Sequence, residues 1–240
     1  MPQEKKLEAV MDADNPLLWV GISSLTLLAS HMGLAAAPVR GRLVALLGLK
    51  VYLGVYSLAA VAALGWMVVS YQQAPHIRLW QVSAFRWLPL VLMPCSLVLI
   101  VLGNITPGPT AILLKEHPKK SWTPFGIQRI TRHPSLWGIA LWALAHLLAA
   151  GTPAGVLFFG GFFLLAVAGS VHIDRRRKLH LAAQWPAFSA QTSNIPFAAI
   201  LAGRTRLIPG ELSLPAIAGA LMLYGLLVGF HPLLLGAPAF

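Results

Sequence analysis

Acidic residues and cysteine are the scarcest chemical groups in this chain of 240 residues. It holds 7 Asp and Glu against 18 Lys and Arg, and charged residues make up only 10% of it. The one cysteine, Cys95, excludes an internal disulfide framework and a cysteine-rich metal site, and we expect it to be a buried core residue. The motifs of zinc proteases, P-loop nucleotide hydrolases, serine hydrolases and Asp-rich diphosphate enzymes are absent. Carboxylate chemistry within the apolar segments is therefore not expected.

Apolar residues dominate what remains. They make up 57% of the chain and the mean hydropathy is +0.72, which excludes a disordered chain and disfavours a water-soluble enzyme. They form six blocks of about the 20 residues that a helix needs to cross a bilayer. The blocks fall at 17–37, 51–71, 86–105, 134–150, 154–173 and 212–232. We therefore predict an all-α polytopic membrane protein with about six transmembrane helices, long cytoplasmic loops and an interfacial amphipathic helix.

The blocks indicate a simple domain organisation. Residues 1–16 form a polar N-terminal tail, and residues 17–240 form a single integral-membrane domain. The fourth and fifth blocks are joined by the short segment Gly151-Thr152-Pro153, which predicts a tight antiparallel hairpin.

Two connections are long. Residues 106–133 contain four prolines and are expected to be irregular and at the surface. Residues 174–211 open with the charged run 174–178, which continues the fifth helix out of the membrane. Farther along, Trp185 and Phe188 indicate an amphipathic stretch that lies at the membrane interface.

The net charge of +11 comes from cations that cluster in these connections. We assign them to membrane topology and contact with lipid headgroups, and expect no nucleic-acid partner. The tail and the second connection hold Lys5, Lys6, Arg78 and Arg86, and the connections after the first, third and fifth blocks hold the other 14 of the 18. By the positive-inside rule these three loops face the cytoplasm and both termini lie on the opposite side. The expected location is a bacterial inner (cytoplasmic) membrane.

Histidine is the main candidate for chemistry inside the blocks. His31, His146 and His172 lie within blocks, and His133 stands at the entrance to the fourth. An imidazole in the hydrocarbon region needs a partner, which is either a group on a neighbouring helix or a bound ligand. Neutral imidazole binds iron, copper and zinc, and in the absence of a thiolate or carboxylate set two opposed histidines suit a b-type haem best.

Depth in the membrane tests a pair formed by His31 and His146. His31 lies about six residues, or roughly 9 Å, from the cytoplasmic end of its helix, whereas His146 lies about 12 residues, or roughly 18 Å, from the same side. Opposed ligands of one iron should lie at one level, so helix tilt or an inset start of the fourth helix must absorb the mismatch. His133 and His172 lie nearer to His31 in depth and are the alternatives.

The tripeptide Arg132-His133-Pro134 opens the fourth block. Pro134 suits a first helical turn, where its missing N–H costs nothing. Arg132 and His133 then stand at the headgroup level, either as part of a site or as a helix start with a snorkelling cation.

Longer motifs connect these histidines to a known family. They are Ser30-His31-Met32-Gly33-Leu34-Ala35, Arg132-His133-Pro134, Leu144-Ala145-His146, His172-Ile173-Asp174-Arg175-Arg176, the pair Trp185 and Phe188, Thr192-Ser193-Asn194-Ile195-Pro196-Phe197-Ala198-Ala199-Ile200, and Gly203-Arg204. Together they resemble the NnrU family, which includes the plant zeta-carotene isomerases. The resemblance is close over about 129–208, looser over 17–60 and weak between.

The resemblance implies an integral membrane protein, and for the isomerase branch a b-type haem with histidine axial ligands. It further implies redox-dependent cis–trans isomerisation of an apolar polyene that enters from the bilayer, with an electron donor that the sequence does not identify. Carried over by motif, His31 and His146 are the implied haem ligands and catalytic residues. His133, His172, Arg132, Asp174 and Arg175 are the further implied cofactor-binding residues.

Two positions depart from the family's pattern, and two other functions remain open. Ala143 stands where plant members have a cysteine and Met32 where a serine is common, so ligand switching through a thiolate is excluded at that site. One alternative is an NnrU-type accessory protein of nitrite or nitric oxide respiration without isomerase activity. The other is a methyltransferase that uses S-adenosylmethionine; such enzymes also carry Arg-His-Pro before a membrane hairpin, but here their paired acidic residues are reduced to Asp174 and a distant Glu211.

Overall fold

The structure is a computed structural model, and it describes residues 15–111 and 122–235. Within these ranges it is all-helical and contains no strand, as predicted. The elements are α2 (Pro16–Ala35), α3 (Ala37–Leu47), α4 (Leu49–Gln73), η1 (Ser83–Trp87), α5 (Leu88–Ile105), η2 (Gly126–Arg129), α6 (Pro134–Ala150), α7 (Pro153–His180), α8 (Trp185–Gln191), α9 (Ala198–Leu201), η3 (Pro209–Glu211) and α10 (Leu214–Leu235). All but the last two residues of the predicted N-terminal tail lie outside the described residues.

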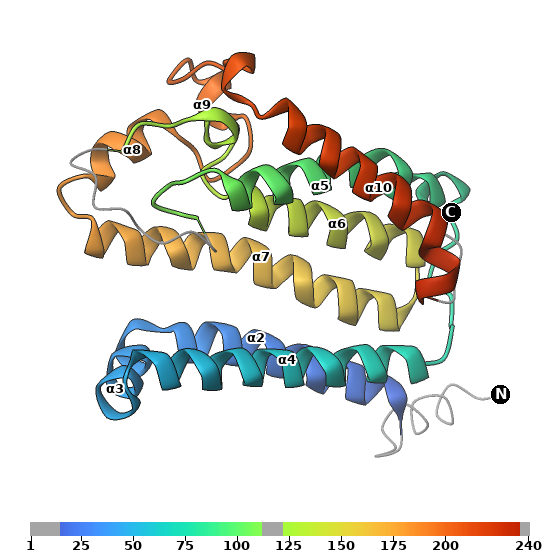
Figure 1. Cartoon of the computed structure of the whole chain (residues 1–240). Coiled ribbons are helices and arrows are strands. Elements are labelled where there is room, and N and C mark those ends of the chain that lie inside the picture. The colour runs from blue at the N-terminus through green and yellow to red at the C-terminus, as the bar shows by residue number, and fades with distance from the viewer. Residues whose placement is uncertain (1–14, 112–121, 236–240) are drawn as a thin grey trace.

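Five helices are long and apolar enough to cross a membrane: α2, α4, α5 with η1, α7 and α10. The sixth predicted helix, α6, has the predicted bounds but only 17 residues, about 26 Å. It packs between α5 and α7 (Figure 1), so it belongs to the same bundle. A membrane protein is therefore indicated, and six crossings stay a prediction.

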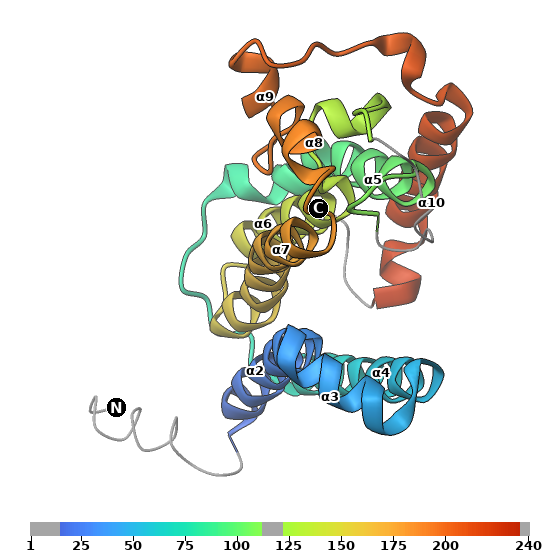
Figure 2. The same cartoon turned by 90° about the vertical axis from the view of Figure 1, so that its left-hand side faces the viewer.

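The long helices pack in the spatial order α4, α2, α7, α6, α5 and α10, as Figures 1 and 2 show. The start of α2 and the end of α10 lie at one end of the bundle, and α3, α8 and α9 lie at the other, which we call the loop end. This placement fits the predicted topology, in which both termini lie on one side and the long connections on the other. Which end faces the cytoplasm remains a prediction.

Small residues and hydroxyls bring the helices into close contact. Ser96 on α5 donates a hydrogen bond of 2.7 Å to the Gly138 carbonyl on α6, and a Cβ on Gly138 would clash with the α5 backbone. Ser24 on α2 donates one of 2.9 Å to the Leu157 carbonyl on α7, opposite Gly161. Buried side-chain hydroxyls thereby find carbonyl acceptors where no water is available.

The predicted hairpin between α6 and α7 is present. Gly151 takes a left-handed conformation with φ 57°, which ends α6 at low steric cost. Thr152 then caps α7 by accepting a hydrogen bond of 3.0 Å from the Gly155 N–H, and Pro153 fills the first helical position. The run 174–178 continues α7, also as predicted.

Helix α2 ends earlier than its apolar block, and the chain turns into a helix, α3, that the sequence did not predict. Pro38 cannot donate to the Leu34 carbonyl, so the helical hydrogen bonding stops there. The Leu34 carbonyl instead accepts a hydrogen bond of 3.0 Å from the Tyr52 hydroxyl, and the Ala35 carbonyl accepts one of 3.3 Å from Nε2 of His172. Side chains of α4 and α7 thus satisfy the open end of α2.

Two expectations about single residues need correction. Trp185 and Phe188 lie on α8, but they are buried against Trp122 rather than turned toward a lipid interface. This seven-residue helix therefore covers the loop end of the protein itself. Cys95 is exposed rather than buried, because α5 presents it to an apolar cavity beside α6 and α10.

Candidate functional site

A cavity of about 930 Å³ lies between α2, α4, α6 and α7, toward the loop end of the bundle. Its body is apolar, with side chains such as Leu53, Ile139 and Phe162. Two of the predicted histidines, His31 from α2 and His172 from α7, line it together. Its volume is at the upper end of the range for cofactor and ligand pockets.

His31 is held in one orientation by its own helix. Its Nδ1 lies 3.0 Å from the Leu27 carbonyl oxygen. Its ring packs against that of Tyr56 on α4 in a T-shaped arrangement, with the ring centroids 5.6 Å apart. Because a carbonyl only accepts, Nδ1 carries the proton and Nε2 keeps its lone pair. A histidine fixed in this way through one nitrogen is prepared to bind a metal through the other.

His172 faces the same cavity but is already engaged. Its Nε2 lies 3.3 Å from the Ala35 carbonyl, across the contact between α7 and the end of α2. This contact gives His172 a structural role as a partner of the open end of α2. The bond is long, so it holds the ring weakly.

His146 lies outside this cavity lining. Its Nδ1 donates to the Trp142 carbonyl at 2.9 Å, the arrangement that His31 has with Leu27, so its Nε2 also keeps a lone pair. Its ring packs on Phe159 of α7, with centroids 5.3 Å apart.

The structure does not bring His31 and His146 together. Met32 packs beside Gly169, so His31 lies level with a position near residue 168 of α7. His146 lies level with Phe159, about nine residues away, which is roughly 13 Å along the helix. The depth mismatch expected from the sequence is therefore present.

Three of the other predicted residues, Arg132, His133 and Asp174, form a second cluster around the Asp174 carboxylate. Arg132 binds both carboxylate oxygens, at 2.9 Å and 2.7 Å, and His133 Nε2 lies 2.6 Å from one of them. Asn194 adds a bond of 3.1 Å. This cluster ties the start of α6 and the segment after α8 to one carboxylate in the last third of α7.

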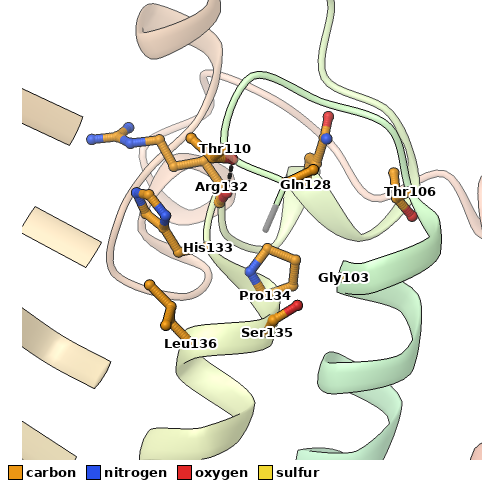
Figure 3. Close-up of a pocket in the computed structure, with 10 residues that line it drawn as sticks. Gly103, Thr106, Thr110, Gln128, Arg132, His133, Pro134, Ser135 and Leu136 are labelled. Atoms are coloured by element: carbon orange, nitrogen blue, oxygen red, sulfur yellow. Dashed lines mark hydrogen bonds between the residues drawn. The ribbon is translucent and has the colours of Figure 1, made fainter. Parts of the chain in front are cut away.

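The side chain of His133 is fully buried in this cluster. Figure 3 shows His133 beside Arg132 and Pro134, in the lining of a small pocket. Burial lowers the pKa of His133, and the Asp174 carboxylate acts in the opposite direction. A neutral ring that donates from Nε2 leaves Nδ1 as an acceptor, and Nδ1 has no hydrogen-bond partner among the described residues. The Ser135 hydroxyl likewise has no hydrogen-bond partner among the described residues. Both residues line a cavity of about 10 Å³, which has room for about one water.

Four further residues show what the sequence pattern missed. Arg175 is exposed and lies outside the cavity lining, whereas Arg176, which we did not single out as a site residue, lines it. Tyr52 and Tyr56 form a row on one face of α4; their spacing of four residues was the available signal. Asn194 belongs to the family motif but received no role.

A second cavity of about 550 Å³ lies on the other side of α6. Its lining is almost wholly apolar and includes Cys95, Trp137 and Leu221. Phe197 also lines it, with the only positive φ, 63°, of any described residue other than glycine. No cluster of three or more His, Cys, Asp or Glu side chains suited to a metal ion occurs within the described ranges.

These features define the class: an all-helical membrane protein with an internal cavity that joins an apolar body to histidine and arginine side chains. The family described as "NnrU protein" matches residues 18–239, and the chain belongs to it, which confirms the family predicted from the motifs.

Two curated relatives carry the name 15-cis-zeta-carotene isomerase, chloroplastic. The protein of Zea mays is 31% identical over 131 residues, which cover 54% of this chain and 36% of that protein. The protein of Arabidopsis thaliana is 33% identical over 127 residues, which cover 51% and 34%. The chain thus spans about a third of the length of these relatives. No solved structure matches it.

Proposed function

We propose that this protein is a membrane isomerase that converts a cis double bond of a long apolar polyene to trans, with haem b as cofactor. The observation that carries the proposal is His31, an oriented imidazole with a free Nε2 in a large, mainly apolar cavity. The family and the names of the two relatives support the reaction class.

The residues present fit haem b in two respects. Nε2 of His31 is the kind of ligand that haem iron takes, and the hydrogen bond at Nδ1 is the usual support of such a ligand. The cavity offers neither a thiolate nor a carboxylate among its described lining residues, which disfavours a zinc or calcium site. When bound, haem b supplies an iron whose oxidation state controls its free coordination position.

The chain's own residues then have distinct tasks. His31 would hold the iron from α2, and His172, once released from the Ala35 carbonyl, would be the second imidazole available from the cavity lining. Leu53, Ile139 and Phe162 receive the apolar polyene and exclude water. The Asp174 cluster fixes α6 against α7 and so positions one wall of the cavity.

The first test is the visible spectrum of the detergent-purified protein, oxidised and reduced, compared with His31→Ala, His172→Ala and His146→Ala. We expect a Soret band that shifts on reduction, is lost with His31 and changes with His172. His146→Ala serves as the matched control, because its ring has the same internal hydrogen bond but lies outside the cavity lining. A colourless protein after haem is supplied would refute the cofactor. Loss of the band with His146 alone would overturn the ligand assignment.

The reaction is tested by adding a polyene with a central cis bond to the haem-loaded protein under reducing conditions and separating the isomers. We expect conversion to trans that depends on reduction and on His31. Full haem loading without any isomer change would contradict the isomerase and favour the accessory role in nitrogen-oxide respiration. Binding of S-adenosylmethionine would favour the methyltransferase.

We further propose that the protein lies in a bacterial inner membrane, with the loop end in the cytoplasm and both termini on the other side. The excess of Lys and Arg in the three connections at that end supports this orientation. Single cysteines introduced into a Cys95→Ser chain test it. An impermeant thiol reagent added to intact cells should label the Trp80→Cys variant and spare the Thr205→Cys variant, and the reverse pattern would contradict the orientation.

A further inference from the structure

Three arginines, Arg40 from α3 and Arg176 and Arg177 from α7, line the loop end of the large cavity. None of the described residues that line the cavity is acidic. The two acidic residues in the described part of the chain, Asp174 and Glu211, form their ion pairs elsewhere. The cavity therefore combines an apolar body with a cationic end.

The position of Arg40 is set by α4. Its guanidinium lies over the ring of Tyr52, 5.8 Å from the centroid. Tyr52 is buried, 4% exposed, and its hydroxyl is fixed on the Leu34 carbonyl. A guanidinium stacked on a fixed aromatic ring keeps its N–H groups available at its edge.

A row of rings connects this cationic end to His31. The ring centroids of Tyr52 and Tyr56 are 6.1 Å apart, and those of Tyr56 and His31 are 5.6 Å apart. On the opposite wall, His172 and Arg176 are separated by one helical turn and share a face of α7. Imidazole and guanidinium groups thus follow one another along both walls of a single ligand space.

Membrane topology alone does not account for this arrangement. Arg42 on α3 and Lys178 on α7 are exposed and lie outside the cavity lining, so they already provide positive charge at the loop end. Arg40 and Arg176, two residues away on the same helices, are half-buried and line the cavity. Partial burial of charge is costly, and an anionic ligand offsets that cost.

We propose that Arg40 and Arg176 bind the carboxylates of an amphipathic ligand whose apolar body fills the cavity. The inference rests on the proposed function where that ligand is haem b, since haem b carries two propionates on one edge of its ring. The same chemistry occurs in a fatty acid from the bilayer, and the experiment separates the two sources.

The test compares each carboxylic acid with its ester, using the full chain in nanodiscs of zwitterionic lipid. Haem and haem dimethyl ester are titrated against the unmodified protein, the double variant Arg40→Gln/Arg176→Gln and the matched control Arg42→Gln/Lys178→Gln. The unmodified protein and the control should bind the acid at least tenfold more tightly than the ester, a ratio that corresponds to about 1.4 kcal/mol. The cavity variant should lose this preference while keeping its affinity for the ester.

The second arm uses spin-labelled stearic acid and its methyl ester. A preference for the acid here, with no haem bound in the first arm, would support the carboxylate site and reject haem as its occupant. If the unmodified protein prefers the acid to the ester in neither of the two arms, the inference is overturned. It is also overturned if the control variant loses the preference as fully as the cavity variant does. Arg40→Lys/Arg176→Lys keeps the charge and guards against misfolding, and it should retain part of the preference.

Discussion

Truncation of the Asp174 side chain should lower the free energy of unfolding strongly, although it removes only a few atoms. Its carboxylate holds Arg132, whose side chain is 14% exposed, and His133, whose side chain is fully buried. Replacing Asp174 by Ala leaves a largely buried guanidinium without its counter-charge. Removing one partner of a buried ion pair costs about 3–5 kcal/mol.

This magnitude can be converted into an unfolding temperature. For a chain of this size, each kcal/mol shifts the midpoint by about 2–4 °C, so Asp174→Ala should unfold roughly 6–20 °C below the unmodified protein. The assay is intrinsic fluorescence during heating in detergent, at one fixed scan rate because such unfolding is often irreversible. Lys178→Ala, an exposed charge on the same helix, is the control and should shift by less than about 2 °C.

A double-mutant cycle with Arg132→Met tests the reasoning itself. If the two side chains stabilise the fold through each other, the double variant should lose less than the sum of the single losses. We expect a coupling above about 1 kcal/mol, since the pair is bidentate and mostly buried. Losses that add within about 0.5 kcal/mol would show that the carboxylate acts independently of Arg132, and the argument from an unpaired buried cation would be refuted.

Three further changes probe the backbone and the surface. Gly138→Ala should destabilise by about 1–3 kcal/mol, because its Cβ would meet the α5 backbone, whereas Gly54→Ala, which faces open space, should be neutral or slightly stabilising in the same melt. Phe197→Gly should be more stable than Phe197→Ala by about 1 kcal/mol, because both lose the ring but only Gly relieves the positive φ; equal melts would contradict this. The hydrogen bonds from Arg129 lower the pKa of Glu211, so this pair stabilises the protein above the ordinary carboxyl value of 4.5 and the contribution is lost as the pH falls below it. The difference in unfolding temperature between Glu211→Gln and the unmodified protein should therefore close on acidification from pH 7.

The sequence predicted the helices well where hydropathy and proline act together. The bounds of α6 are those of its block, because Pro134 starts the helix and Gly151 ends it. The prediction failed where an apolar segment continues through a break. Residues 17–37 read as one block, yet α2 ends at Ala35, because hydropathy does not register the hydrogen bond that Pro38 cannot donate.

The sequence could identify the candidate histidines but not which of them lie together. The free-energy cost of placing an imidazole in hydrocarbon marks each histidine as a candidate by itself, and it says nothing about which residues are its neighbours. That His172 and not His146 shares the cavity with His31 depends on the register of α7 against α2, which long-range contacts fix. Trp185 and Phe188 show the same limit: an apolar face indicates burial, but not whether lipid or protein covers it.

The cavity owes its place to a contrast between the two ends of α2. Toward its start, Ser24 bonds the α7 backbone opposite Gly161, and the two helices touch too closely to leave space. Toward its end, Pro38 stops the helix, its last carbonyls are satisfied by side chains from α4 and α7, and the chain turns into α3. This turn brings Arg40 into the lining of the space that remains. The break that hydropathy misses is thus the feature that places a cation beside the apolar cavity in which an oriented imidazole lies.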